Sequence, residues 1–445
     1  MEDKNIIAIE IGSSKVKGAI GTYSPSGVLT VQAVEEEQLL DWVRYGAVSN
    51  VEEVAALTNR IIRKIENRVA PRKVDTIYVA MGGRSFCSVP REVQRELADE
   101  MEITESIIER LIKDAAVSQY PDREMLAVIP REFIVDKTRV EHPKGTVGRN
   151  IRMSANLITC RPQTKRNLDR LFTEKLKLRI GGYEVRQIAL GDMVLSSDEK
   201  RLGCMLVDFG AETTTVSIYK HGHLQYLATL PMGSRNITRD ITKLNYLEEQ
   251  AEELKRTMGN ASGTPNAQPA MGGIDYSAVN NFVSHRCGEI IANIKEQIKL
   301  AGLTPADLPA GIVIVGRGAL LTGFNERLAT VTTMKIRTGS ISNPNLRIAD
   351  SRISPADAAD VLAVLFQAAR HGAEECLSTP QTEQITEKPV DEKVVEVEEI
   401  KPVVTVETET RRPKKPSWLE RMKTAVANAM TETDDDDESD LKDDE

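Results

Sequence analysis

Glycine and hydroxyl residues directly follow an apolar run near the start of the chain. The segment EIGSSKVKG, residues 10–18, begins with Glu10, at the end of a run that we expect to be a buried strand. The backbone N–H groups of such a turn can surround phosphate oxygens, and a carboxylate can hold Mg²⁺ through water. Lys15 or Lys17 could add positive charge. Turns containing Gly-Ser-Ser are common, so this motif alone leaves an ordinary structural turn open.

A similar design occurs twice more. LVDFGAETTTVSI, residues 206–218, repeats the apolar run, the carboxylate of Asp208, the glycine Gly210 and the hydroxyl residues. IVIVGRGALLTG, residues 312–323, runs into a Gly-x-Gly turn at which the backbone could approach an adenosine or a phosphate closely. We therefore consider the three turns together as candidates for one phosphate-binding site.

The elements around these motifs repeat along the chain. Apolar runs predict buried strands, and helical spacing predicts helices. The strands are expected at residues 5–12, 74–81, 203–209 and 311–315, and the helices at 51–69, 247–258 and 283–300. Both halves follow the plan strand, glycine turn, strand, strand, helix, strand. This internal repeat favours an α/β protein of two lobes with a ligand in the cleft between them.

Composition limits the function classes. Hydrophobic residues make up 40% of the 445 residues and charged residues 28%, so most of the chain should be globular, in more than one domain. The net charge of −9 argues against a nucleic-acid binder. Five scattered cysteines without CxxC spacing indicate reduced thiols, and the histidines form no ligand cluster. No segment has the pattern of a signal peptide or of a membrane-spanning helix.

The three motifs, in this order and spacing, resemble the phosphate-1, phosphate-2 and adenosine motifs of the actin, Hsp70 and sugar-kinase superfamily. The resemblance implies an α/β, two-lobed actin-like ATPase fold, with a ribonuclease-H-like sheet in each lobe, that closes over Mg-ATP. In AEELK, Glu252 and Lys255 match the superfamily residues that contact ribose and adenine, and i,i+3 spacing places them on one helix face. Glu10 and Asp208 would hold Mg²⁺ through water. The cofactor-binding residues that the resemblance implies are Gly12, Ser13, Ser14, Lys15, Asp208, Gly210, Thr213, Thr214, Gly233, Glu252, Lys255, Gly316, Arg317 and Gly318.

Three positions depart from the superfamily pattern. Glu10 stands where Asp is usual, Glu212 interrupts the glycines of the second motif, and Arg317 interrupts those of the third. Glu212 would add negative charge near the phosphates if its side chain turned inward. Hydrolysis needs a polar group that positions the attacking water. Asp192 is the candidate besides Glu10, although a helix N-cap or a surface carboxylate explains Asp192 equally well. We expect ATP binding with slow or regulatory turnover, because backbone amides and Mg²⁺ do most of the holding.

Residues 84–163 distinguish between members of the superfamily. Their segments 103–116, 121–136 and 143–159 resemble subdomain 1C of the FtsA family of bacterial division proteins, an inserted α/β subdomain that a sugar kinase should lack. The resemblance implies polymer contacts and recruitment of later division proteins through subdomain 1C. It also implies that a second-lobe subdomain (2B), at about residues 233–310, binds the tubulin-like division protein FtsZ.

The chain is expected to divide where its motifs and composition change. The predicted parts are a first lobe (subdomain 1A) at residues 1–83, 164–200 and 345–376, subdomain 1C at 84–163, a second lobe at 201–344, a disordered linker at 377–413, an amphipathic helix at 414–430 and an acidic tail at 431–445. The linker is predicted from a composition of Thr, Glu, Val, Lys and Pro without a helical period.

The segment 411–430 has the pattern of an amphipathic helix behind basic residues. Its apolar stripe includes the membrane-facing candidates Trp418, Leu419, Met422 and Val426. On an anionic bilayer this stripe would be buried, and each nearby basic residue would contribute roughly 1 kcal/mol. A helix that docks on a protein partner is the alternative. The FtsA family is similar in ending with a linker and a membrane-targeting helix.

The resemblance to the FtsA family therefore implies an ATP-binding cell division protein that forms filaments and tethers FtsZ to the inner membrane. It would act on the cytoplasmic face of that membrane, at the division site. Two alternatives remain: a small-molecule kinase of the same superfamily, and an actin-like scaffold of the pilus-assembly type. Coupled release of ADP on adding substrates would reveal a kinase. A pilus-type scaffold should lack the amphipathic helix and should not bind FtsZ.

Overall fold

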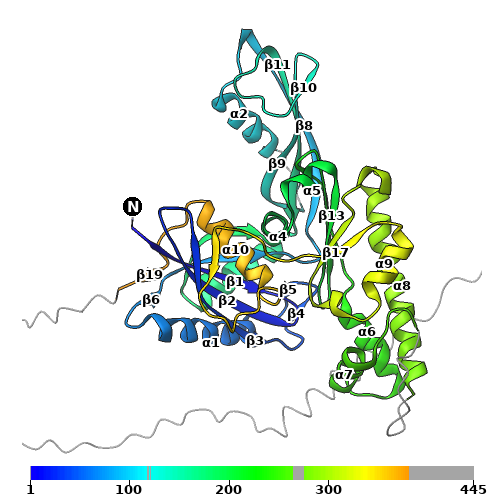
Figure 1. Ribbon diagram of the computed structural model, residues 1–445. Coiled ribbons are helices and arrows are strands. Elements are labelled where there is room, and N and C mark those ends of the chain that lie inside the picture. The colour runs from blue at the N-terminus through cyan, green and yellow to red at the C-terminus, as the bar shows by residue number, and fades with distance from the viewer. Residues whose placement is uncertain (1, 118–119, 121, 264–274, 380–445) are drawn as a thin grey trace, which may run out of the picture. The chain divides into compact units, whose positions relative to one another are not determined.

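The computed structural model describes residues 2–117, 120, 122–263 and 275–379, all of which belong to one compact unit of the chain. Two large β-sheets organise this unit (Figure 1). The predicted linker beyond residue 379, the amphipathic helix with its membrane-facing candidates and the acidic tail lie outside the described residues. Within the described ranges, no helix is long and apolar enough to cross a lipid bilayer.

The first sheet has six strands in the order β12-β7-β1-β2-β3-β18. Strands β1, β2 and β3 form an antiparallel meander, and β7, β12 and β18 join it in parallel. The bounds are β1 (Lys4–Ile11), β2 (Lys15–Tyr23), β3 (Leu29–Gln38), β7 (Thr76–Met81), β12 (Arg179–Val185) and β18 (Leu346–Ile348). The central strands β1 and β7 are buried almost throughout, as the unbroken apolar runs predicted.

The second sheet contains the order β15-β14-β13-β16-β17, which repeats the order β3-β2-β1-β7-β12 of the first. Here too an antiparallel meander is followed by two parallel strands. The bounds are β13 (Cys204–Phe209), β14 (Thr214–Lys220), β15 (His223–Leu230), β16 (Ile312–Val315) and β17 (Ile336–Thr338). The predicted internal repeat is therefore present as a repeated topology.

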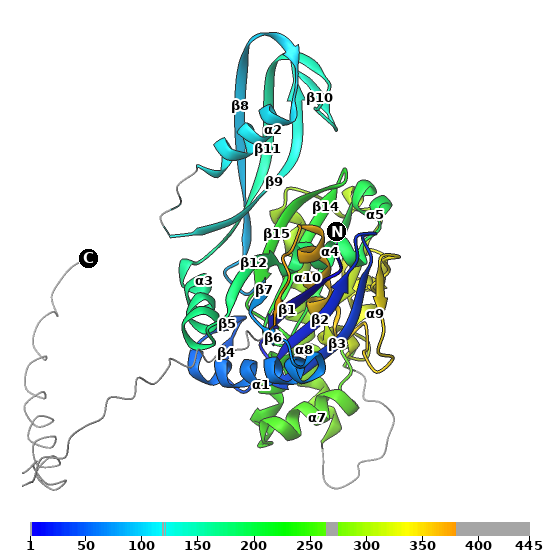
Figure 2. The same cartoon turned by 90° about the vertical axis from the view of Figure 1, so that its left-hand side faces the viewer.

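An inserted domain extends the second sheet beyond β15. Its strands are β8 (Cys87–Glu102), β9 (Glu124–Val135), β10 (Thr138–Val140) and β11 (Val147–Cys160), and its helix is α2 (Glu105–Ala116). The long strands β8 and β11 pair along most of their length (Figure 2). A single pair, Ala228 with Cys87, joins β15 to β8. The domain has its own apolar cluster, in which Ile107 and Leu111 of α2 lie with Met153 and Leu157 of β11.

Helices α1 and α10 cover opposite faces of the first sheet (Figure 1). Gly18 and Gly21 lie on opposite faces of β2 and leave room for Ile61 of α1 and Leu365 of α10. The helix bounds are α1 (Val51–Val69), α3 (Pro162–Asp169), α4 (Arg186–Val194), α5 (Ser197–Leu202), α6 (Ser234–Ile241), α7 (Glu248–Met258), α8 (Tyr276–Leu300), α9 (Phe324–Thr332) and α10 (Ala359–Arg370). One apolar cluster surrounds the first sheet and also includes residues on one face of the second sheet, such as Leu206 and Val313. A second cluster lies on the other face of the second sheet, with Val207 and Ile314.

Two short strand pairs complete the described fold. They are β4 (Val43–Arg44) with β5 (Ala47–Val48), and β6 (Lys73–Val74) with β19 (Leu377–Ser378). The linker was predicted to begin at residue 377, but Leu377 pairs with Val74 and its side chain is buried. The apolar side chains of Cys376 and Leu377 belong to the first-lobe core, which holds the chain there two residues longer than its composition indicated.

Candidate functional site

The turns between β1 and β2 and between β13 and β14 have the same closing bond. The N–H of Gly12 donates to the carbonyl of Lys15, and the N–H of Gly210 donates to the carbonyl of Thr213, each over 2.9 Å. A Cβ at Gly12 would lie 3.1 Å from a carboxylate oxygen of Glu10, and a Cβ at Gly210 would lie 3.0 Å from the carbonyl of Thr213. Glycine therefore allows both turns to be this tight.

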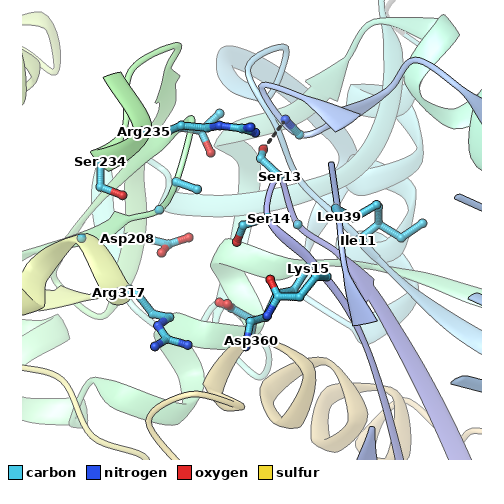
Figure 3. Close-up of a pocket in the computed structure, with 18 of the residues that line it drawn as sticks. Ile11, Ser13, Ser14, Lys15, Leu39, Asp208, Ser234, Arg235, Arg317 and Asp360 are labelled. Atoms are coloured by element: carbon cyan, nitrogen blue, oxygen red, sulfur yellow. Dashed lines mark hydrogen bonds between the residues drawn. The ribbon is translucent and has the colours of Figure 1, made fainter. Parts of the chain in front are cut away.

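Both turns line one cavity of about 970 Å³ between the two sheets, a volume that suits a small-molecule ligand. Figure 3 shows Ser13, Ser14 and Lys15 on one side of this cavity and Asp208 with Ser234 on the other. The predicted residues that line it are Glu10, Gly12, Ser13, Ser14, Lys15, Asp208, Gly210, Thr213, Glu252, Lys255, Gly316, Arg317 and Gly318. Residues almost 310 positions apart in the chain are thus brought together.

Three predicted residues do not line the cavity. Thr214 is buried, and its hydroxyl donates to the carbonyl of Met232 over 2.8 Å. Gly233 precedes α6, where a Cβ would lie 2.4 Å from the carbonyl of Ala211, so this glycine allows α6 to approach the second turn. Asp192 accepts a bond of 2.5 Å from Lys200. It lies six residues into α4, about 9 Å along the axis from the end that faces the cavity. Its predicted role in positioning water therefore has no support in its placement.

The third glycine turn lies against the second. Gly316 has φ +88°, and a Cβ there would lie 2.5 Å from the carbonyl oxygen of Phe209. A Cβ at Gly318 would lie 2.7 Å from the Phe209 ring. Arg317, between the two glycines, has a half-exposed side chain 3.6 Å from Asp357. The departure from three glycines thus adds a cation at the cavity wall without blocking the close approach.

Glu252 and Lys255 lie together on α7, as their spacing predicted. The Lys255 ammonium donates to Glu252 over 2.6 Å and to the hydroxyl of Thr238 over 3.0 Å. Burial lowers the pKa of Lys255, and the neighbouring carboxylate of Glu252 opposes that shift. Lys15, by contrast, lines the cavity while its ammonium is bound to Glu36.

Arg186 is a site residue that the sequence analysis missed. It is the first residue of α4, and its side chain is 15% exposed. One terminal nitrogen of its guanidinium donates to Glu10 over 3.1 Å, and the other donates to Asp208 over 2.8 Å. This side chain therefore connects the carboxylates at the ends of β1 and β13. No spacing signal marks it, because the contact exists only when both sheets face each other.

Glu10 and Asp208 are buried, Arg186 shifts the pKa of each of them, and each of them shifts the pKa of Arg186. Burial raises the pKa of Asp208 to about 7, and Arg186 opposes that shift. Burial and the charge of Asp360 also raise the pKa of Glu10, while Lys17 and Arg186 oppose them. Burial disfavours the charged form of Arg186, but the carboxylates of Asp208, Asp360 and Glu10 outweigh burial and raise its pKa. The guanidinium is therefore a permanent cation among carboxylates.

The same geometry tests the predicted Mg²⁺ site. Glu10 and Asp208 were expected to hold the ion through water, yet both carboxylates already accept bonds from one guanidinium. Among the residues that the structure describes, no group of three or more Asp, Glu, His or Cys side chains is arranged to hold a metal ion. These residues, as placed, do not fit a Mg²⁺ ion shared between Glu10 and Asp208.

Glu212 does not face the cavity. Its carboxylate is 1% exposed and accepts bonds of 2.7 Å from the N–H of Tyr45 and from the guanidinium of Arg239. Arg235 lies 3.8 Å from the same carboxylate and 3.0 Å from Asp41. The carboxylate that could have repelled phosphates instead joins the second turn to the β4–β5 hairpin of the first lobe.

Two sheets that share the order of five strands, with facing glycine turns between them, define the actin-like class of two-lobed α/β proteins. The fold is similar to that of the PilM-PilN type IV pilus biogenesis complex, with a TM-score of 0.57, 16% identity, and coverage of 83% of this chain and 98% of that one. This likeness shows the fold alone. It shows that a pilus biogenesis protein, the second alternative in the sequence analysis, has a similar fold.

Sequence relatives identify the family. Residues 205–390 match the family described as "Cell division protein FtsA", and residues 83–159 match the "SHS2 domain inserted in FTSA". The chain is 31% identical to cell division protein FtsA of Porphyromonas gingivalis, over 76% of this chain and 74% of that protein. It is 26% identical to the FtsA of Bacillus subtilis, over 76% and 78% respectively. The chain belongs to the FtsA family, which confirms the resemblance found in the sequence.

Proposed function

We propose that this protein binds an adenine nucleotide in the cavity between the two glycine turns. One observation carries the proposal: two turns closed by the same backbone bond face a single cavity, and a third glycine turn lies beside them. Backbone N–H groups at such turns suit phosphate oxygens. The polar pair Glu252 and Lys255, at the same cavity, suits a ribose or a base. Hydrolysis is proposed to be slow, since Asp192 lies away from this cavity.

Calorimetric titration of the purified full chain with ATP and with ADP tests this proposal. We expect saturable binding at one site per chain. Gly12→Ala should weaken binding by about tenfold or more, which corresponds to about 1.4 kcal/mol, because the added Cβ narrows the first turn. Gly182→Ala is the matched control, since a Cβ there would lie 3.2 Å from the Tyr78 ring, a similarly close approach, but Gly182 does not line the cavity. Failure to bind any adenine nucleotide would contradict the proposal.

We further propose that the protein forms filaments and tethers FtsZ to the cytoplasmic face of the inner membrane, at the division site. Membership of the FtsA family supports this role. The inserted SHS2 domain supports recruitment of later division proteins and polymer contacts through residues 84–163. The second-lobe subdomain at about residues 233–310 is the proposed FtsZ-binding part. The basic, amphipathic segment 414–430 is the proposed membrane anchor.

Co-sedimentation with anionic liposomes, with and without ATP, tests the adaptor role. The full chain should bind liposomes and carry FtsZ with it, whereas a chain without residues 414–430 should bind FtsZ but leave it in the supernatant. Removal of residues 432–445 should strengthen liposome binding, because the acidic run is repelled by anionic lipid. Equal sedimentation with and without 414–430 would rule out this anchor.

A further inference from the structure

The buried contact of Arg186 joins carboxylates that belong to different sheets. The side chains of Glu10 and Asp208 are each 4% exposed, so both carboxylates are largely removed from water. Buried carboxylates need a cation and hydrogen bonds to remain charged. Arg186 supplies both to each of them. The cation that offsets these two carboxylates at the phosphate end of the cleft is thus part of the polypeptide.

A guanidinium differs from a metal ion in ways that matter at this place. It holds a fixed positive charge, and its planar nitrogens can bond two carboxylates at once. It cannot be removed by a chelator. A divalent ion could bind between Glu10 and Asp208 only after both bonds to Arg186 were broken, which would leave the buried guanidinium without partners there. The arrangement therefore excludes a metal ion from this position as long as Arg186 stays in place.

Other groups around Arg186 hold it in position. The guanidinium lies beside Gly82 at the end of β7, where a Cβ would be 3.5 Å from the Nε atom. Asp360 at the start of α10 adds a third negative charge, and Lys17 lies 4.0 Å from Asp360. All of these residues line the cavity. Three carboxylates and two cations from five elements thus meet at the wall that the nucleotide phosphates would contact.

We propose that Arg186 takes the place of a divalent metal ion at the phosphate end of this cleft, so that the nucleotide binds without added Mg²⁺. This inference rests on the proposed nucleotide binding and specifies how the phosphates are held. Arg186 is a positioning residue: it orients Glu10 and Asp208 and presents positive charge toward the phosphates. Magnesium that accompanies ATP in solution is then not required by the protein.

The test compares nucleotide affinity in excess Mg²⁺ with affinity in excess EDTA, on the full chain. The wild-type protein should bind ADP and ATP with dissociation constants that agree within about threefold between the two conditions. Arg186→Gln should bind about tenfold more weakly than wild type in EDTA, and Mg²⁺ should restore most of the loss. Arg186→Lys keeps the positive charge but lacks the planar guanidinium that bonds two carboxylates. In EDTA its nucleotide affinity should lie between those of the wild-type protein and Arg186→Gln.

Mn²⁺ binding, followed by electron paramagnetic resonance without nucleotide, gives a readout independent of affinity for ATP. The wild-type protein should not bind Mn²⁺ between Glu10 and Asp208, whereas Arg186→Gln should acquire a site that Asp208→Asn removes. Arg352→Gln is the matched control, because Arg352 lies on the surface with Asp350. A wild-type protein that binds nucleotide only with Mg²⁺ overturns this inference and leaves the proposed function intact. A wild-type protein that binds no nucleotide in either condition overturns the proposed function itself.

Discussion

The two glycine turns of the cleft have the same backbone and different side-chain partners. In the first turn, the hydroxyl of Ser13 accepts a bond of 3.0 Å from the N–H of Gly46, within its own lobe. In the second turn, the carboxylate of Glu212 accepts bonds from Tyr45 of the other lobe and from Arg239. The two turns therefore share the backbone geometry that faces the cavity, and the second turn also forms a hydrogen bond between the lobes.

The chemistry of the two partners explains the difference in what each turn can do. A hydroxyl that accepts one neutral bond contributes about 1 kcal/mol. A buried carboxylate bound by a guanidinium is worth more, because removal of one partner leaves an uncompensated charge. Substitutions in the second turn should therefore destabilise the protein more than equivalent substitutions in the first.

The largest effect is expected from Glu212→Ala. The substitution removes the acceptor of the Tyr45 N–H and the partner of Arg239, so the free energy of unfolding should fall by about 3 kcal/mol. Urea denaturation of the variant and the wild-type protein measures this difference in the free energy of unfolding. Glu212→Gln keeps one acceptor oxygen for the Tyr45 N–H and should cost less. A loss below about 0.5 kcal/mol for Glu212→Ala would show that the contact between the lobes is not stabilising.

Gly316→Ala should have the next largest effect. The positive φ of +88° and a Cβ placed 2.5 Å from the carbonyl of Phe209 would force the third turn away from the second, at a cost of about 2 kcal/mol. Nucleotide affinity should fall as well. Gly222→Ala serves as the comparison, since it has a similar φ of +81° with nothing within 4 Å of its Cβ. Equal losses in the two variants would mean that strain rather than the close approach matters.

Ser13→Ala tests the weaker turn. Loss of the acceptor for the N–H of Gly46 should lower the free energy of unfolding by about 1 kcal/mol. Thermal denaturation of this variant beside Glu212→Ala compares the two turns directly. A larger loss for Ser13→Ala than for Glu212→Ala would reverse the comparison.

The smallest expected effect is the pH dependence of stability that comes from Asp240, in the same helix (α6) as Arg239. Burial raises the pKa of Asp240, but its bonds to Arg286 and Lys243 outweigh burial and lower the pKa below its usual value. The stability from this pair is therefore present above about pH 4 and is lost as the pH falls through the lowered value. We expect a loss of roughly 1 kcal/mol between pH 5 and pH 2. Asp240→Asn should be less stable than wild type at pH 7 and should lack this part of the pH dependence.

The site could be predicted from the sequence where its parts are local. Gly12, Gly210 and Gly316 follow apolar runs, and a glycine at the end of a buried strand indicates a tight turn in any fold. The same holds for Glu252 and Lys255, whose spacing determines the helix face that they share. Thr214 belongs to the second motif segment and Gly233 precedes α6. Both lie beside the second turn and do not line the cavity.

The sequence by itself determined the repeated succession of strands, turns and helices, the glycine turns and the family, because each of these is encoded in residues close together in the chain. Only the tertiary structure decided which charges meet. Arg186 lies 176 residues from Glu10 and 22 from Asp208, and Glu212 lies 167 from Tyr45. Such contacts depend on how two sheets face each other, and a side chain that finds its partner across a cleft leaves no periodic signal along the chain.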